Sequence, residues 1–325
     1  MTTAEQSGRA LPNRTSGERD ATQPQARDRT APSVPNATNT VNSGEAEQFT
    51  VGVATREDWE AVVELANAEG WNVGHHDADC FLSTDPEGFF VGKLGDRVVS
   101  AVSLVTYGDS YGVWGNYVVH PDFRGRGLGR ATCKAARRHG GDRILASDAM
   151  PDRVENYQRS GLVPVHDTVN YVGHPERGVN GGTAVRVGLE HLDAVIAYDA
   201  QSFPAERDRF LRNWLTSAGH TAYVRLVDGR VTGYGVIRTA PRCQRIGPLV
   251  ADTPEDAEAL FDALTADLGP DEEVSVFAPQ SQDSAGSFFT DRGLAEQFRV
   301  VRMYTGDVPS GEADRVLAIG SLELG

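Results

Sequence analysis

The sequence predicts an α/β protein made of two similar domains, each with a mixed, mostly antiparallel sheet flanked by helices. Strand-like and helix-like hydrophobic patterns alternate from Phe49 onward, and the same order of patterns returns in the second half of the chain. A segment rich in Gly, Pro and Asn separates the two halves. The predicted division is a tail (1–47), a first domain (48–172), a linker (173–184) and a second domain (185–325).

The composition excludes several classes of protein. The 325 residues are 39% hydrophobic and 24% charged, as in globular proteins. No apolar run approaches the roughly 18 residues of a membrane span, and the polar N-terminus carries no signal-peptide core, so we expect neither a membrane protein nor a secreted one. Cys80, Cys133 and Cys243 lie far apart. This spacing argues against a disulfide framework and against a metal site, and it favours the cytoplasm.

The charge balance is strongly acidic. Asp and Glu number 46 against 31 Lys and Arg, which gives a net charge of −15 and disfavours binding to nucleic acid or to an anionic membrane. Lys93 and Lys134 are the only lysines. An acidic, lysine-poor surface predicts a halophilic protein. A GC-rich genome would explain the few lysines but less readily the acidity.

The tail (1–47) contains no aromatic residue and has six acidic and five basic residues. Such a segment has too little apolar surface to offset the conformational entropy lost on folding, so it is predicted to be disordered.

The first domain is predicted to have the order β-α-α-β-β-β-α-β-α-β. Its first helix, 57–69, carries Trp59, Val62, Val63 and Ala66 at helical spacing. The other predicted elements are a strand at 49–53, a short helix near 78–82, a hairpin with strands 89–94 and 98–106, a strand at 111–119, a helix at 127–139, a strand at 144–147, a short helix at 153–159 and a strand at 163–171.

Three segments of the second domain repeat segments of the first. Residues 224–231 match 91–98 at an offset of 133, 247–250 correspond to the strand end at Val118-Val119, and 289–294 match 157–162 at an offset of 132. A helix predicted at 254–268 corresponds to the one at 127–139. The similar offsets favour a duplicated domain over chance.

A loop of Arg and Gly after the strand end at Val118-Val119 predicts an anion site. Glycines let backbone N–H groups close around a phosphate, and a helix N-terminus adds about half a positive charge. A P-loop needs Lys-Ser/Thr after the last glycine, and a Rossmann fingerprint belongs in a parallel β-α-β unit, so both fit less well than a diphosphate cradle. A merely solvated basic helix is the remaining alternative. The candidate cofactor residues are Val118, Val119, Arg124, Gly125, Arg126, Gly127, Leu128, Gly129, Arg130 and Ala131.

The run Arg124-Gly125-Arg126-Gly127-Leu128-Gly129 resembles motif A (Arg-x-x-Gly-x-Gly) of the GNAT acyltransferase superfamily. Tyr157-x-x-x-Gly161-Leu162 resembles its second motif, and the whole chain is similar to a tandem GNAT subgroup with a divergent C-terminal GNAT domain. The resemblance implies acetyl-CoA as co-substrate, with its pyrophosphate on the amides of 126–131 and its pantetheine arm on the backbone of Val118 and Val119.

Acetyl transfer to an amine requires a base, an oxyanion donor and an acid. The resemblance assigns the acid to Tyr157, whose phenol could protonate the departing thiolate; the alternative is that Tyr157 only packs the core. The Val119 amide is the candidate oxyanion donor. Many family members carry a Glu base where this chain has Gly115, and an Asn where it has Met150. The base is therefore unassigned.

The loop after the first helix supplies the candidate acceptor-site residues. The stretch Trp71-Asn72-x-Gly74-x-x-Asp77 resembles a recurring stretch of the tandem subgroup, and Asp77, His75 or His76 could act through water. The alternatives are a core position for Trp71 and exposed, inactive histidines. The predicted acceptor-site residues are Trp71, Asn72, His75, His76 and Asp77.

The second domain lacks the cradle motif and has Phe289 where the first has Tyr157. Together with the family resemblance, which implies the reaction, these features predict an acetyl-CoA-dependent N-acetyltransferase with one working site, which transfers acetyl to a primary amine of a small molecule or peptide. The alternative is an acyl-CoA sensor or assembly module without turnover. The sequence specifies neither the acceptor nor the oligomeric state.

Overall fold

The computed structural model describes residues 48–176, 178, 181–280, 283–309 and 313–325. The predicted disordered tail (1–47) lies outside these residues, as does part of the predicted linker.

The first half of the chain has the predicted order of elements. Thr55 begins α1 with a capping box, in which its side chain accepts a hydrogen bond from the Asp58 amide and the Asp58 side chain accepts one from the Thr55 amide. The elements are β1 (Phe49–Val53), α1 (Arg56–Ala68), α2 (Asp77–Thr84), β2 (Phe89–Leu94), β3 (Arg97–Tyr107), β4 (Tyr111–Val119), α3 (Leu128–Gly140), β5 (Ile144–Ala149), α4 (Val154–Gln158) and β6 (Val163–Gly173).

The second half repeats this order with one addition, a short final strand. The repeat confirms the duplication that the sequence offsets predict. The elements are β7 (Ala184–Arg186), α5 (Leu192–Asp199), α6 (Asp208–Thr216), β8 (His220–Val227), β9 (Arg230–Arg238), β10 (Gln244–Ala251), α7 (Pro254–Thr265), β11 (Val274–Pro279), α8 (Asp283–Thr290), β12 (Leu294–Tyr304) and β13 (Val316–Ala318).

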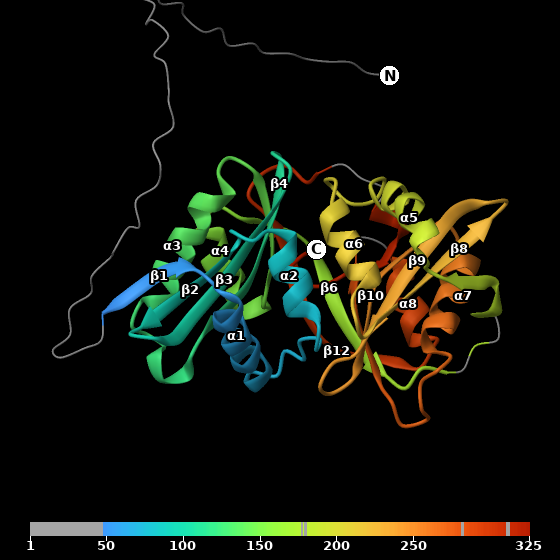
Figure 1. Ribbon diagram of the computed structural model, residues 1–325, viewed down its shortest axis with the longest axis horizontal. Helices are drawn as coiled ribbons and strands as arrows, with labels where there is room; N and C mark the ends of the chain where they lie inside the picture. Colours follow the sequence, from blue (N-terminus) through green and yellow to red (C-terminus); the bar gives the residue numbers. More distant parts are fainter. Residues whose placement is uncertain (1–47, 177, 179–180, 281–282, 310–312) are drawn as a thin grey trace, which may run out of the picture. The chain divides into compact units, whose positions relative to one another are not determined.

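The two halves exchange their long last strands, so their sheets are joined rather than separate. In the described residues the strand order is β1-β2-β3-β4-β5-β12-β6-β11-β10-β9-β8-β7, with β13 beside β10. Figure 1 shows β6 and β12 in the middle of the molecule, between the two halves. β12 pairs with β5 of the first half, and β6 pairs with β11 of the second half. The alternation of apolar and polar residues in β6 and β12 would be the same beside either neighbouring strand. The sequence pattern therefore does not predict the exchange.

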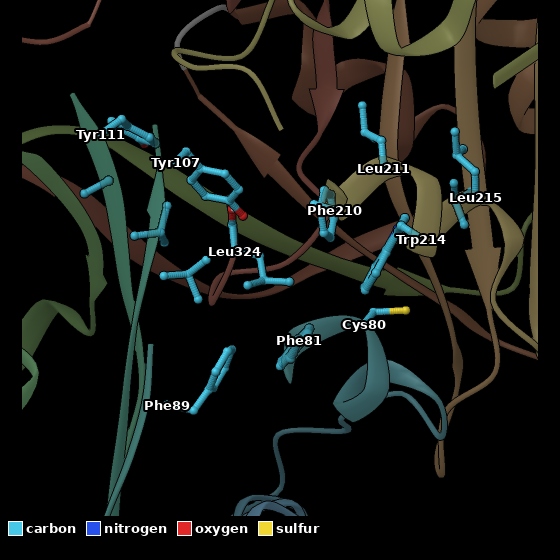
Figure 2. Close-up of a cluster of buried hydrophobic side chains, with 14 of the residues drawn as sticks. Cys80, Phe81, Phe89, Tyr107, Tyr111, Phe210, Leu211, Trp214, Leu215 and Leu324 are labelled. Atoms are coloured by element: carbon cyan, nitrogen blue, oxygen red, sulfur yellow. The ribbon is translucent and has the colours of Figure 1, made fainter. Parts of the chain in front are cut away.

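Helices cover both faces of the first half of the sheet. Alternate residues of β3 point to opposite faces: Val102 and Leu104 pack in a cluster with Ala136 of α3, whereas Ala101 and Val105 pack in the cluster that contains Trp59 of α1. We call these the α3 face and the α1 face. The α1-face cluster continues into the second half of the chain through α6, where Phe81 stacks against Trp214 (Figure 2).

Candidate active site

Strand β4 separates from β5 after four residue pairs. The parallel ladder ends at Trp114↔Ser147. At the same point β4 bulges, because its pairing with β3 skips from Gly115 to Val118, and Asn116 adopts a left-handed φ of 51°. We call the unpaired stretch, Gly115–Val119 of β4 opposite Asp148–Ala149 of β5, the β4–β5 split.

The bulge changes which residues of β4 face α3. Before it, Val113 packs on the α1 face, and Gly115 has the same orientation because no irregularity separates the two. After it, Tyr117 and Val119 point to α3. A Cβ atom added to Gly129 of α3 would lie 2.5 Å from the Tyr117 hydroxyl oxygen and 2.6 Å from Cγ2 of Val119. Gly129 is therefore required for close packing of α3 on β4.

The N-terminus of α3 lies beside the split and offers free amide donors. Gly127 is the N-cap, with φ of 79° and no side-chain cap, and the first helical bond runs from the Ala131 amide to the Gly127 carbonyl. The amides of the first helical turn therefore have no intrahelical acceptor. Gly125 also has a left-handed φ of 75°, and a Cβ added at either glycine would meet no atom within 4 Å. These two glycines are needed for conformation, whereas Gly129 is needed for space.

Arginines surround this loop, and one of them fixes its start. Arg124 donates from Nε to the Val119 carbonyl at 3.0 Å and pairs with Glu69, the C-cap of α1, at 2.5 Å. Arg126 lies over the Phe123 ring, 5.1 Å from its centroid. Arg130 and Lys134 are exposed on α3, with Arg137 and Arg138 in its last turn. The first turn of α3 contains no acidic residue, so the local charge favours an anion.

The Val119 amide points into the split. The His120 amide donates to the Val99 carbonyl of β3 at 2.9 Å. Because successive amides of a strand point to opposite edges, the Val119 amide faces the edge away from β3. This is the orientation that an oxyanion donor in the split needs.

Tyr157 of α4 approaches the split from the α3 face. Its ring packs with Ala149, Leu162 and Met303. Burial raises the pKa of the Tyr157 phenol to about 12, with smaller contributions from Cys133 and Tyr117, so the phenol holds its proton at neutral pH. Burial also raises the pKa of Cys133 to about 12, which keeps this neighbour a thiol and a poor nucleophile.

Two of the predicted acceptor-site residues use their polar side chains to bond to the second half of the chain. Asp77 is completely buried and pairs with Arg238 of β9 at 3.0 Å. Burial alone would raise the Asp77 pKa, but Arg238, His220 and Arg245 outweigh it, and the pKa lies well below its usual range. The Asn72 side chain donates to the Cys243 carbonyl and accepts from the Arg242 amide. The polar groups of Asp77 and Asn72 are thus engaged in joining β9 and β10 to the first half.

The other three predicted acceptor-site residues lie in the same loop with different exposure. Trp71 is half-buried against the α1-face cluster. His75 is exposed, and its amide donates to the Thr239 carbonyl at 3.1 Å. His76 is the N-cap of α2 without a side-chain capping bond, and its ring lies against Gly219.

A residue that the sequence analysis did not select lies against Gly115. A Cβ atom added there would stand 2.7 Å from Cα, 3.1 Å from Cβ and 3.3 Å from Cγ of Glu323. Glu323 follows β13, more than two hundred positions along the chain from Gly115. It belongs to no motif, so no signal in the sequence identified it.

The equivalent region of the second half is closed. The β10–β11 ladder ends at Ile246↔Val276, but β13 pairs with β10 at Leu249 and Val250 and occupies the position of a split. Helix α7 begins with a Thr253 cap that accepts from the Asp256 amide, and its first turn contains Pro254 and Glu255. Phe289, the counterpart of Tyr157, is fully buried.

Two negative findings concern the described residues only. No three His, Cys, Asp or Glu side chains gather there as metal ligands. No helix in that part of the chain has both the length and the apolarity of a membrane span.

Comparisons with known proteins agree with this geometry. Residues 56–161 match the acetyltransferase (GNAT) family, and residues 195–318 match an acetyltransferase (GNAT) domain. The chain is 33% identical over 282 residues to holothin acyltransferase of Pseudoalteromonas sp. (strain SANK 73390), which covers 86% of this chain and 96% of that protein.

Two solved structures share the fold over most of their length. A putative acetyltransferase from Pyrococcus horikoshii has a TM-score of 0.72 at 20% identity, covering 85% of this chain and 96% of its own. A tandem GNAT protein from the clavulanic acid biosynthesis pathway has a TM-score of 0.55 at 18% identity, covering 80% and 99%. The matching domains and the acyltransferase relative support acyl transfer, and the chain belongs to the GNAT acetyltransferase family as a tandem GNAT protein.

Proposed function

We propose that the chain is an acetyl-CoA-dependent N-acetyltransferase with one working site, at the β4–β5 split, and that its acceptor is an amine of a small molecule. The observation that carries this proposal is the coincidence of three features at the split. The free amides of α3, the inward-facing Val119 amide and the protonated Tyr157 all meet where β4 leaves β5.

The residues at the start of α3 fit a diphosphate. The amides of the first turn lack acceptors, and Arg126 and Arg130 add positive charge beside them. The left-handed glycines leave the space above the loop free of Cβ atoms. Acetyl-CoA bound here would supply an activated acyl group as a thioester. The β4 edge within the split would hold the pantetheine arm through the backbone of Val118 and Val119.

Tyr157 and the Val119 amide suit the two ends of the transfer. The amide would stabilise negative charge on the carbonyl oxygen. A phenol with its pKa raised to about 12 stays protonated and can donate to the departing sulfur. Its position on the α3 face, the same face as the cradle, matches the side from which the thiolate leaves.

In this proposal the second half of the chain has a non-catalytic role. Its residues Arg238 and Arg242 bond to the loop at 70–77 of the first half. Its strand β13 occupies the position that corresponds, in the second half, to the β4–β5 split. We infer that this half shapes the acceptor side of the first site. The relative is named holothin acyltransferase, which makes holothin one acceptor to test.

Incubation of the whole chain with acetyl-CoA and a panel of amines tests the proposal. The panel contains holothin, primary alkylamines, arylamines and a peptide with a free N-terminus. We expect release of free CoA thiol together with an acceptor heavier by one acetyl group in the mass spectrum. Binding of acetyl-CoA without thiol release for every amine would instead support the sensor or assembly alternative.

A further inference from the structure

We propose that Glu323 is the general base of this site, and that the base is thus delivered by the segment 319–325 that follows β13. This inference rests on the proposed function and goes beyond it, because it assigns the proton acceptor that strand β4 itself does not provide.

The position of Glu323 is fixed by Gly115 at the start of the split. Its Cα, Cβ and Cγ atoms all lie within 3.3 Å of where a Gly115 side chain would begin. Glu323 therefore fills the space that any larger residue at 115 would need. Glycine at 115 is thus the residue that allows a carboxylate from a distant segment to approach the split.

Glu323 and Tyr157 approach the split from opposite faces of the sheet. Gly115 faces the α1 face together with Val113, so Glu323 lies on that face. Tyr157 interacts with Tyr117 and Cys133 on the α3 face. An amine that attacks a thioester from one side while the sulfur leaves on the other needs this arrangement of base and acid.

The Glu323 carboxylate is available for proton transfer. Glu323 is half-buried, and its carboxylate accepts no hydrogen bond and forms no ion pair with any residue that the structure describes. Glu323 acts electrostatically on Arg238 of β9, whose guanidinium is already paired with Asp77. Asp77 is fully buried and has its own partner, and the Asp148 side chain of the split is buried and paired with Arg302 at 2.8 Å, so both of these carboxylates are engaged where that of Glu323 is not.

The segment that carries Glu323 is firmly anchored. The Leu324 side chain is fully buried near Tyr107 (Figure 2), and the Tyr107 hydroxyl donates to the Leu324 carbonyl at 2.8 Å. Arg207 donates to the Gly325 carbonyl at 3.0 Å. The Ser321 hydroxyl accepts from the amides of Glu323 and Leu324. These contacts hold Glu323 in one position relative to β4, as a positioned base requires.

The proton balance is simple. Glu323 takes one proton from the ammonium form of the acceptor, and the freed electron pair forms the C–N bond. As the C–S bond breaks, Tyr157 gives its proton to the sulfur and produces the CoA thiol. The proton still carried in excess by the new C–N nitrogen passes to Tyr157 through water, and Glu323 releases its proton to solvent. One proton is released per acetyl group transferred.

The test compares Glu323→Gln with Glu64→Gln, the same change at an exposed position of α1. Melting temperatures and acetyl-CoA affinities are measured first. We expect both variants to melt like the parent chain and to bind acetyl-CoA with an affinity within a factor of two of the parent's. With the acceptor selected from the panel, Glu323→Gln should lower kcat by about 10²-fold or more. Its rate should rise about tenfold per pH unit up to the pKa of the amine, because only amine that is already neutral reacts. Glu323→Asp should recover part of the loss.

Three outcomes separate the inference from the proposed function. Normal turnover of Glu323→Gln, with acetyl-CoA bound and used, would overturn the role of Glu323 alone. A lower melting temperature with an unchanged pH profile of the rate would also overturn it. A residue that only neutralises the charge of Arg238 would affect stability and not proton transfer. If the parent chain does not bind acetyl-CoA or shows no turnover, the proposed function is wrong, and so is the role of Glu323.

Discussion

The helices α3 and α7 begin at equivalent places in the two halves but present opposite chemistry. Helix α3 starts with two glycines around Leu128 and has no acidic residue in its first turn. Helix α7 starts with Thr253 and Pro254, followed by Glu255 and Asp256. One helix start offers free amides to an anion. In the other, Thr253 satisfies one amide, Pro254 has no N–H, and carboxylates repel a phosphate.

The strand edges beside these helices differ in the same direction. The β4 edge is unpaired beyond Trp114, whereas β13 fills the corresponding edge of β10. The same final segment then continues to Glu323 and Gly115. A duplicated fold can therefore keep its core while one copy loses its binding surfaces, and the residues that close the second copy can complete the first.

Replacing the acid of the first half by its counterpart gives the largest expected effect. Tyr157→Phe creates the state that Phe289 has in the second half. We expect kcat to fall by about 10²- to 10⁴-fold, because the departing thiolate loses its proton donor, with acetyl-CoA affinity nearly unchanged. Steady-state kinetics and calorimetry measure the two quantities. The reciprocal change, Phe289→Tyr, is the control and should add no activity. Equal turnover would mean that Tyr157 only packs.

The second prediction concerns the bond between the halves on which the comparison depends. Asp77→Asn leaves the buried Arg238 without its charge partner, and we expect a loss of roughly 3–5 kcal/mol in the free energy of unfolding. The folded-state pKa of Asp77 is lowered, so its contribution is present above its unfolded-state pKa and is lost as the pH falls toward the folded-state value.

Chemical denaturation from pH 7 downward measures this effect. The control is Asp193→Asn, which removes an exposed pair with Arg212 and should cost about 0–1 kcal/mol. Similar losses of unfolding free energy in both variants would show that the buried Asp77–Arg238 pair contributes no more to stability than an exposed pair.

The third prediction transfers one charge of α7 to α3. Arg130 and Asp256 occupy the same third position of their helices. Arg130→Asp should weaken acetyl-CoA at least about tenfold, or about 1.4 kcal/mol, by placing a carboxylate beside the diphosphate. An acid in a first turn favours the helix itself, so folding should be unaffected. Arg209→Asp makes the same change in the first turn of α6 and should leave the affinity unchanged. A loss of equal size in both variants would point to net charge alone.

The smallest expected effect concerns the pH dependence of kcat, which we expect to be flat in the alkaline range. A raised pKa favours the protonated phenol, so Tyr157 stays a competent acid until the pH approaches about 12. We therefore expect no fall in kcat between pH 7 and pH 10, where a phenol with an ordinary pKa of about 10 would be half ionised. Rates measured across this range, with melting curves as a check on folding, decide the matter. A midpoint near pH 10 would contradict the burial argument.

Much of this fold can be predicted from periodicity, and the structure confirms it element by element. The strand predicted at 111–119 matches β4, and the predicted helix at 127–139 lies within one residue of α3 at each end. Local patterns suffice here because each element buries an alternating or helical set of residues. The cradle and Tyr157 remain predictions whose surroundings agree with their proposed roles.

Other features depend on contacts between distant segments, and no local pattern encodes them. The exchange of β6 and β12 leaves both strands with equivalent neighbours, so their sequences carry no signal for it. The ion pair of Asp77 does not follow from its neighbours in the sequence, because its partner, Arg238, lies in the other half of the chain. Glu323 belongs to the same class of residue, because only the approach of its segment to Gly115 distinguishes it from other acidic residues.

Isothermal titration of the whole chain with acetyl-CoA tests the central claim most directly. The account predicts a stoichiometry near one, at the start of α3, with the binding heat of the parent weakened or lost in Arg130→Asp. A stoichiometry near two would contradict it, because the second half would then bind the cofactor despite β13 and the acidic start of α7. A single site that Arg130→Asp leaves unchanged would contradict it as well.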